Sequence, residues 1–215
     1  AGEAPPTLRI YHFDPPCLTL GRFQQPGRDA DPEACAARGI DIAIRPTGGR
    51  AVLHAGDLVY AVIAPEDDPM VSGGIIESYR RISQALIAGL SRLGLPELGA
   101  APRKEPLPRN GACFDLPAAY ELTLDGKKLT GSAQVRRGHA VLQHGSILID
   151  DEALRLDGLL RMMGRPIRVG DLNAITLPQA LGRPVTREEV AEAVIAGFRE
   201  HVPGLAEGEL SAGEC

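Results

Sequence analysis

The amino-acid sequence predicts an α+β fold, a mixed, largely antiparallel β-sheet sandwich covered by helices. Three observations support this prediction. Strand patterns occur in runs, with helices between the runs, rather than in strict alternation with helices. A hairpin signal, Asp125-Gly126, stands between two segments with the two-residue period of strands. One long segment, at about 73–93, carries apolar residues at helical spacing and separates the two runs of strands.

The first run of strands fills the first 65 residues, which contain little helix. Two strands are expected in "TLRIYHF" and "CLTLGRF", separated by a turn at Asp14-Pro15-Pro16. A short helix in "DPEACAARG" should end at Gly39, and "IDIAIR" alternates like a strand. The sequence "PTGG" then predicts a tight turn, which is followed by strands in "RAVLH" and "DLVYAVIAP".

The long helix should stop at Gly94, and Pro96 prevents its continuation. The Pro-rich passage that follows is predicted to be a loop as far as Pro117. Cys113 lies on this loop, in the stretch "NGACFDLPAAYEL". An unpaired cysteine is most often a small buried apolar residue, but loops held on a rigid scaffold frequently carry catalytic groups.

The second run of strands is the clearest supersecondary signal. Residues 119–150 predict three consecutive antiparallel strands, with turns at Asp125-Gly126 and at Arg137-Gly138-His139. Helical patterns are expected to resume over 151–163. A last helix should begin at Thr186, where Thr-Arg-Glu-Glu has capping-box spacing, with an apolar face of Val190, Ala193, Val194, Gly197 and Phe198. The strands on both sides of 101–118 are expected to join one sheet, so 1–215 is taken as a single domain.

Composition limits the classes of function. A net charge of −5 and a pI of about 5.6 argue against broad nucleic-acid binding. No apolar run approaches the roughly 20 residues that span a bilayer, and the first residues lack a signal-peptide pattern. The four cysteines, which have no CxxC spacing, suggest neither a zinc site nor a disulfide framework, and a reducing, cytoplasmic setting is expected.

The charge is unevenly distributed. Within 101–140, seven basic residues stand against four acidic ones; the basic ones are Arg103, Lys104, Arg109, Lys127, Lys128, Arg136 and Arg137. A local basic surface on an acidic protein suits an acidic partner. A solvated charged face explains the same residues equally well.

Three segments carry residues capable of chemistry. In "RPTGGRAVLHAGDL" (45–58), Gly48-Gly49 allows close approach of a ligand while Arg45 and Arg50 supply charge, although a plain hairpin turn is the commoner meaning. In "GKKLTGSAQ" (126–134), Thr130 and Ser132 share the face of Lys128 if one strand begins there, but such a lysine is usually a solvated edge residue. In "LQHGSILI" (142–149), a polar His144-Gly145-Ser146 interrupts an apolar strand; a lone histidine there is usually a hydrogen-bonded core residue.

These segments, in this order, resemble the lipoate/biotin protein ligase superfamily. The additional "ACFDLPAAYEL", with Cys113 lying 15 positions before Lys128, resembles the cysteine-dependent octanoyltransferases of that superfamily (the LipM type). The resemblance covers about residues 7–200. It implies the biotin/lipoyl protein ligase catalytic fold and an octanoyl-[acyl carrier protein]:protein N-octanoyltransferase, acting in lipoate biosynthesis without metal or ATP.

The resemblance also implies roles for particular residues. Cys113 corresponds to the nucleophile that carries an acyl thioester, and Lys128 to the family's catalytic lysine. The residues implied to bind substrate are Arg45, Thr47, Gly48, Gly49, Arg50, His54, Ser132, Ala133, His144 and Gly145. The expected donor is octanoyl-acyl carrier protein, an acidic protein that the basic excess of 101–140 would fit, and the expected acceptor is a lipoyl domain or glycine cleavage H protein.

The chemistry agrees with these roles. A free thiol has a pKa of about 8.5, so a nearby ammonium is needed to keep it ionised at neutral pH. Lys128 would supply that charge and afterwards act as a base for the incoming lysine. Backbone amides would stabilise the oxyanion of the thioester under attack.

Three other readings stay open. An ATP-dependent lipoate ligase of the same fold would need ATP and Mg²⁺, and a sibling amidotransferase would take octanoyl from glycine cleavage H protein. A module that holds acylated proteins without turnover would leave Cys113 as a small apolar residue without a catalytic role.

Two departures from the family pattern bear on the choice among these functions. The usual helix before the first strand is missing, so the chain is expected to be truncated or processed or to lack that helix. Arg50 stands where lipoate ligases tend to have a third glycine, which agrees with a transferase.

Overall fold

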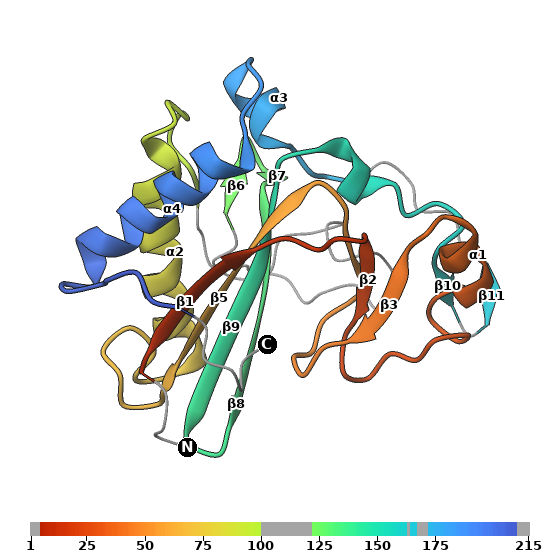
Figure 1. Cartoon of the computed structure of the whole chain (residues 1–215), viewed down its shortest axis with the longest axis horizontal. Coiled ribbons are helices and arrows are strands. Elements are labelled where there is room, and N and C mark those ends of the chain that lie inside the picture. Colours follow the sequence, from red (N-terminus) through yellow and green to blue (C-terminus); the bar gives the residue numbers. More distant parts are fainter. Residues whose placement is uncertain (1–4, 100–121, 163, 167–171, 210–215) are drawn as a thin grey trace.

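A computed structural model describes residues 5–99, 122–162, 164–166 and 172–209. In it a large antiparallel sheet stands between a layer of helices and a smaller sheet (Figure 1). The predicted α+β fold is therefore confirmed. The two larger of the three core clusters in the described residues follow from this arrangement, one between the large sheet and the helices and one beneath the small sheet.

The large sheet joins strands from both halves of the chain. Its order is β1-β5-β9-β8 and every pairing is antiparallel. The strands are β1 (Thr7–Tyr11), β5 (Asp57–Pro65), β8 (Thr130–Arg137) and β9 (Ala140–Leu148). The expectation that strands before and after 101–118 share one sheet is confirmed.

The small sheet has the order β3-β2-β4. It consists of β2 (Cys17–Leu20), β3 (Asp41–Ile44) and β4 (Val52–His54), and β2 pairs with β3 in parallel and with β4 antiparallel. The turn at 14–16 thus carries the chain from the large sheet to the small one. Helix α1 (Pro32–Ala37) connects β2 to β3; Asp31 caps its first turn and Gly39, at φ +66°, ends it as predicted.

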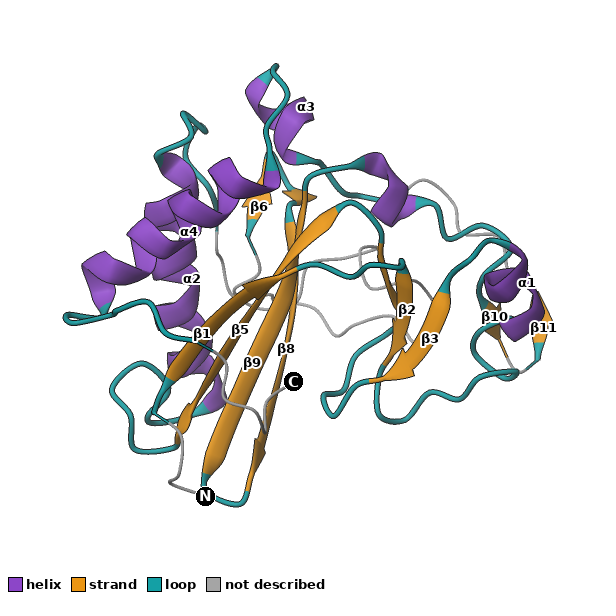
Figure 2. Ribbon diagram, in the orientation of Figure 1, coloured by secondary structure: helices purple, strands orange, loops and turns teal. Residues whose placement is uncertain are grey.

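Helices α2 (Ile75–Ser91) and α4 (Arg187–His201) pack on each other and cover one face of the large sheet (Figure 2). The Thr186 hydroxyl accepts a hydrogen bond from the Glu189 amide, which confirms the predicted start of α4. The five residues predicted for its apolar face are all buried. A short helix, α3 (Leu177–Leu181), was not expected from the sequence.

The predicted strand over 127–135 is interrupted at Leu129. Strands β6 (Thr123–Leu124) and β7 (Lys127–Lys128) form the expected hairpin, but β8 then pairs with β9 in another sheet. The backbone of Lys128 instead bonds to the segment 173–175. No single strand therefore begins at Lys128 and continues through Thr130 and Ser132, which was the condition for the three side chains to share one face.

The predicted helix over 151–163 is also wrong. Only one 3-10 turn forms, η1 (Asp151–Leu154), and the chain continues into a small hairpin of β10 (Arg161–Met162) and β11 (Arg165–Pro166). The apolar residues that suggested a helix are Leu156, Leu159 and Leu160, and they are buried against the small sheet. Gly158, at φ +76°, turns the chain between them.

Candidate active site

A small cavity lies where the turn after β3 meets strands β8 and β9. Its volume is about 40 Å³. Its lining residues are Thr19, Arg45, Gly49, Val52, His54, Gly131, Ser132, Ala133, His144, Gly145 and Ser146. Most of the substrate-binding residues inferred from the sequence therefore meet at one place, although they lie on four separate segments. Thr47 and Gly48 belong to the same turn and reach the site through Arg45 and His144.

Arg45 organises the turn from inside. It is only 8% exposed. Its guanidinium donates to the carbonyl oxygens of Gly48 and Arg50, at 3.0 and 2.6 Å, and to that of Thr19 on β2, at 2.9 Å. Gly49 has φ +94°, and a Cβ there would stand 2.9 Å from the Arg45 guanidinium. The turn is thus held from within by this arginine and is more than a hairpin with surface charges.

Arg50 contributes its backbone. Its carbonyl oxygen accepts the 2.6 Å hydrogen bond from Arg45. Its side chain does not line the cavity. The structure therefore brings Arg50 to the edge of the site but does not place its guanidinium within it.

Thr47 and His144 join the turn to the large sheet. The Thr47 hydroxyl lies 2.7 Å from Nε2 of His144 and also accepts from Nε of Arg45 at 3.2 Å. Burial, the Arg45 guanidinium and, less, His54 lower the pKa of His144 from 6.5 to about 4. The imidazole is thus neutral at ordinary pH. It is able to donate or accept a hydrogen bond in the site without adding charge.

A second buried histidine is fixed by residues that sequence reasoning missed. Nδ1 of His54 lies 2.7 Å from Oδ2 of Asp57, which also accepts a 2.6 Å hydrogen bond from the Ser146 hydroxyl. Nε2 of His54 lies 3.0 Å from the Thr19 hydroxyl. Because a carboxylate only accepts, Nδ1 of His54 is the donor to Asp57. The only sequence signal was the three-residue spacing of His54 and Asp57, which a hairpin turn explains equally well.

The floor of the cavity needs a glycine. Ser132 lies 2.7 Å from the hydroxyl of Tyr60, which also accepts from Gln143 at 3.2 Å. Gly145 pairs with Ser132 across the sheet. A Cβ on Gly145 would stand 2.6 Å from both the Ser132 hydroxyl and the Tyr60 ring. The sequence indicated Ser132 and Gly145, but not Tyr60, which reads as one apolar residue in a buried strand.

Lys128 is buried, with 1% of its surface exposed. Its backbone N–H donates to the carbonyl of Asn173 at 2.8 Å, and its own carbonyl accepts from Ile175 at 3.0 Å. Lys127, the neighbouring residue, is exposed. Lys128 is therefore not a solvent-exposed lysine at the edge of a sheet.

The basic surface expected within 101–140 is smaller than its composition suggested. Lys128 is buried, and the Arg136 guanidinium donates to the carbonyl of Val71 at 2.7 Å and to Ser78 at 3.0 Å. Lys127 and Arg137 are exposed. The other three basic residues, Arg103, Lys104 and Arg109, lie outside the described residues.

Cys113 and the loop predicted around it also lie outside the described residues, as does Cys215. The two described cysteines, Cys17 and Cys35, are free and buried. Burial raises the pKa of both thiols, and nearby carboxylates add to the effect. Neither thiol has the ionised character that a nucleophile requires.

Within the described ranges, no cluster of three or more His, Cys, Asp or Glu side chains has the arrangement of a metal site. The same residues include no helix with the length and apolar character needed to cross a bilayer.

The fold and the site define a class of protein. Residues 1–199 match the model of the lipoyl protein ligase A/B catalytic domain, and the chain belongs to that family. Among solved structures it is similar to a lipoate-protein ligase A bound with ATP, at a TM-score of 0.77 and 26% identity over 99% of this chain and 79% of that one. It is also similar to a putative lipoate protein ligase from T. acidophilum with bound lipoic acid, at a TM-score of 0.72 and 26% identity over 93% and 73%.

Curated relatives narrow the class. The chain is 44% identical to the octanoyltransferase LipM of Kyrpidia tusciae, over 99% of this chain and 82% of the relative. It is 43% identical to the octanoyltransferase LipM of Moorella thermoacetica, over 97% of this chain and 81% of the relative. The resemblance read from the sequence motifs is thereby confirmed.

Proposed function

We propose that this protein is an octanoyltransferase of protein lipoylation. It moves an octanoyl group from octanoyl-acyl carrier protein to the lysine of a lipoyl domain, through a thioester on Cys113. The observation that carries the choice of reaction is the near full-length similarity to octanoyltransferases. No ATP or metal ion takes part in this reaction, because the donor thioester is already activated.

The described residues support separate roles for the turn over 45–50 and for His144. The turn over 45–50 approaches the reacting carbonyl with backbone atoms, and Arg45 holds its shape. Because Arg45 already donates to the Thr47 hydroxyl, that hydroxyl is free to donate to Nε2 of His144. Nδ1 of His144 then carries the proton and donates a neutral hydrogen bond to the acyl carbonyl.

Lys128 acts on the nucleophile. Its ammonium favours the Cys113 thiolate, which attacks the donor thioester; the carrier leaves as its thiolate and takes the proton of Lys128, which becomes a neutral amine. The acceptor lysine then attacks the acyl-enzyme as a neutral amine, and Cys113 leaves. Lys128 receives the proton of the new amide in that step. Burial of Lys128 supports this assignment, because a charge in a buried setting interacts strongly with a nearby thiolate.

The test is intact mass after incubation with octanoyl-acyl carrier protein and no ATP. We expect a mass gain of one octanoyl group that hydroxylamine removes, and no gain in Cys113→Ser. Cys35→Ser is the matched control, since that thiol is buried and should leave acylation unchanged. A gain that persists in Cys113→Ser would contradict the assignment of the nucleophile.

The nearest rival is an ATP-dependent lipoate ligase, because the solved relatives include one bound with ATP. The same assay decides between them. If transfer begins from free octanoate, requires ATP and releases pyrophosphate, the protein is a ligase and the proposed transferase function is wrong. Transfer from octanoyl-H protein but not from octanoyl-acyl carrier protein would identify the sibling amidotransferase.

A further inference from the structure

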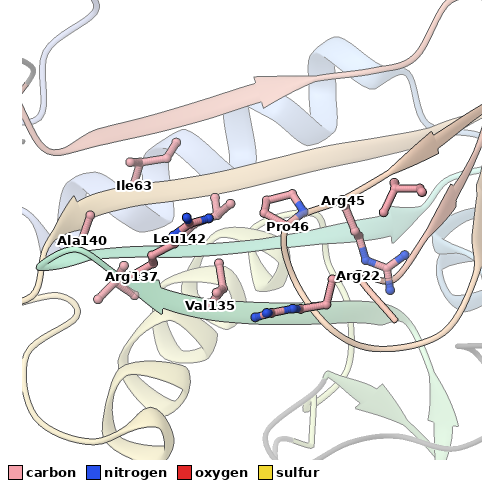
Figure 3. Close-up of a pocket in the computed structure, with 10 residues that line it drawn as sticks. Arg22, Arg45, Pro46, Ile63, Val135, Arg137, Ala140 and Leu142 are labelled. Carbon is pink, nitrogen blue, oxygen red and sulfur yellow. The ribbon is translucent and has the colours of Figure 1, made fainter. Parts of the chain in front are cut away.

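A large groove lies beside the small cavity, on the face of the large sheet opposite α2 and α4 (Figure 3). Its volume is about 800 Å³. Ile63, Val135 and Leu142, from three neighbouring strands, form an apolar floor, and Pro46, next to Arg45 in the chain, also lines the groove. These three floor residues lie in register, Ile63 with Leu142 and Leu142 with Val135, so the floor is a continuous strip across the sheet.

Two arginines stand over this apolar floor. Arg22 approaches from the loop after β2, and Arg137 from the end of β8 (Figure 3). Both side chains are exposed, and Arg22 lies over the ring of Phe23 at 4.8 Å. Within the described part of the chain, neither guanidinium forms an ion pair with a carboxylate. A groove with an apolar floor and two such cations suits a ligand that is both apolar and anionic.

The groove is continuous with the active site. Arg45 lines both the groove and the small cavity. Along β8, Ala133 lines the cavity and Arg137 lines the groove. A strand rises about 3.3 Å per residue, so these two positions are roughly 13 Å apart. A ligand that fills both must carry its reacting group and its anionic group at opposite ends of a long linker.

We propose that the groove holds the 4′-phosphopantetheine arm of the acyl donor. This inference rests on the proposed function. The arm has the chemistry that the groove complements: a thioester at one end, a gem-dimethyl group that matches the apolar floor, and a phosphate at the other end. Arg22 and Arg137 bind the phosphate, and the floor residues pack against the methyl groups. An octanoyl chain alone would leave both arginines without a partner, because it carries no anionic group.

The experiment compares two donors that differ only in the phosphate, octanoyl-4′-phosphopantetheine and octanoyl-pantetheine. The rate of acyl-enzyme formation is followed by intact mass in the wild type and in the double variant Arg22→Ala/Arg137→Ala. A charge-assisted contact predicts that the wild type prefers the phosphorylated donor by roughly 10-fold or more, and that the double variant loses most of this preference. Arg80→Ala is the control, since Arg80 is exposed on α2, on the opposite face of the sheet.

Other results with these donors overturn the inference. Equal losses with both donors would mean that the arginines do not recognise the phosphate. A loss confined to the complete octanoyl-acyl carrier protein would instead assign them to the acidic protein surface. Calorimetry with 4′-phosphopantetheine and pantetheine gives a reading independent of catalysis. If the wild type forms no acyl-enzyme but still binds the phosphorylated arm more tightly through Arg22 and Arg137, the proposed function fails and the groove assignment stands; equal binding of both arms would refute the assignment.

Discussion

At the residue scale, two adjacent lysines on β7 have opposite environments. Lys128 is 1% exposed, whereas Lys127 faces solvent. A charge in a buried setting interacts with its neighbours far more strongly than the same charge in water. The two residues therefore provide a matched pair for testing how Cys113 is activated.

We predict that Lys128→Met raises the apparent pKa for iodoacetamide alkylation of Cys113, while Lys127→Met leaves it unchanged. A unit charge about 4 Å away at an effective dielectric near 20 is worth about 4 kcal/mol before desolvation, and a third of that corresponds to about one pKa unit. Alkylation rate is measured against pH, with Cys17, Cys35 and Cys215 replaced by Ser. A larger shift in Lys127→Met would show that the wrong lysine has been assigned.

His144 makes a second residue-scale prediction, for stability against pH. Its folded-state pKa is about 4, below the ordinary value of 6.5. Between these values the unfolded chain binds a proton that the folded protein does not, so stability falls as pH is lowered from 6.5 to 4. The loss is on the order of 2 to 3 kcal/mol. Urea unfolding of His144→Gln should lack this part of the pH dependence.

His139 is the control for that experiment, because its shift has the opposite sign. The Glu66 carboxylate raises the pKa of His139, so its contribution is present below pH 6.5 and is lost as pH rises through the folded-state pKa. The difference curves of His144→Gln and His139→Asn should therefore slope in opposite directions. Parallel curves would contradict the assigned surroundings of His144.

Much of the site could be predicted from sequence at the scale of residues, because its turn, strand and histidine motifs each have a local pattern. Arg45, Ser132 and His144 were found in this way and line one cavity. Asp57 and Tyr60 were missed. Their functions come from hydrogen bonds to Ser146 and Ser132, each more than 70 residues away along the chain, and no local pattern encodes such contacts.

At the scale of elements, helices α2 and α4 approach each other at two glycines, Gly89 and Gly197. A Cβ on Gly197 of α4 would stand 2.2 Å from the carbonyl oxygen of Ala85 on α2, and one on Gly89 would stand 2.4 Å from that of Ala193. The two helices thus approach backbone to backbone. This contact fixes the layer that covers the large sheet.

We predict that Gly197→Ala destabilises the protein even though alanine is the better helix former. Alanine gains up to about 1 kcal/mol in helix propensity, but the helices must separate, and overpacking typically costs about 1–3 kcal/mol or more. The measurement is the urea midpoint. Gly208→Ala is the control, because a Cβ at Gly208 meets open space, and no decrease is expected there. An unchanged midpoint in Gly197→Ala would contradict the contact.

Elements with their own periodicity and caps could be predicted from sequence, as α2 and α4 show. The prediction of a helix over 151–163 was wrong because the leucines of this segment pack against the small sheet, which is formed by a distant part of the chain. The interruption of the strand at Leu129 could not be predicted either. It exists because Lys128 pairs with the segment 173–175. Pairing between segments far apart in the chain does not alter the spacing of apolar residues within either segment.

At the scale of the whole molecule, Arg45 determines whether the two sheets form one site. It ties β2 to the turn over 45–50, and the same turn reaches the large sheet through Thr47 and His144. Removing the guanidinium leaves buried carbonyl oxygens unpaired, each at a cost of about 1–3 kcal/mol. The turn should therefore lose its fixed shape while each sheet keeps its own pairing.

We predict that Arg45→Met accelerates amide hydrogen exchange in residues 47–50 and abolishes most acyl transfer, with exchange in α2 and α4 unchanged. Arg38→Met is the control. Arg38 also donates to two carbonyl oxygens, those of Arg155 and Asp157, but these lie at the far side of the small sheet. Exchange in the turn that stays slow in Arg45→Met would mean that other contacts hold it.

The pairing of Lys128 with residues 173–175 also has a consequence for how the protein is made. Translation proceeds at about 5–20 residues per second, so the chain that supports Lys128 emerges some seconds after the lysine itself. The residues that line the cavity have all been synthesised before that segment appears. A nascent chain therefore holds the residues that line the cavity before it holds the anchored lysine, and the proposed transfer chemistry starts only after the segment 173–175 has been made.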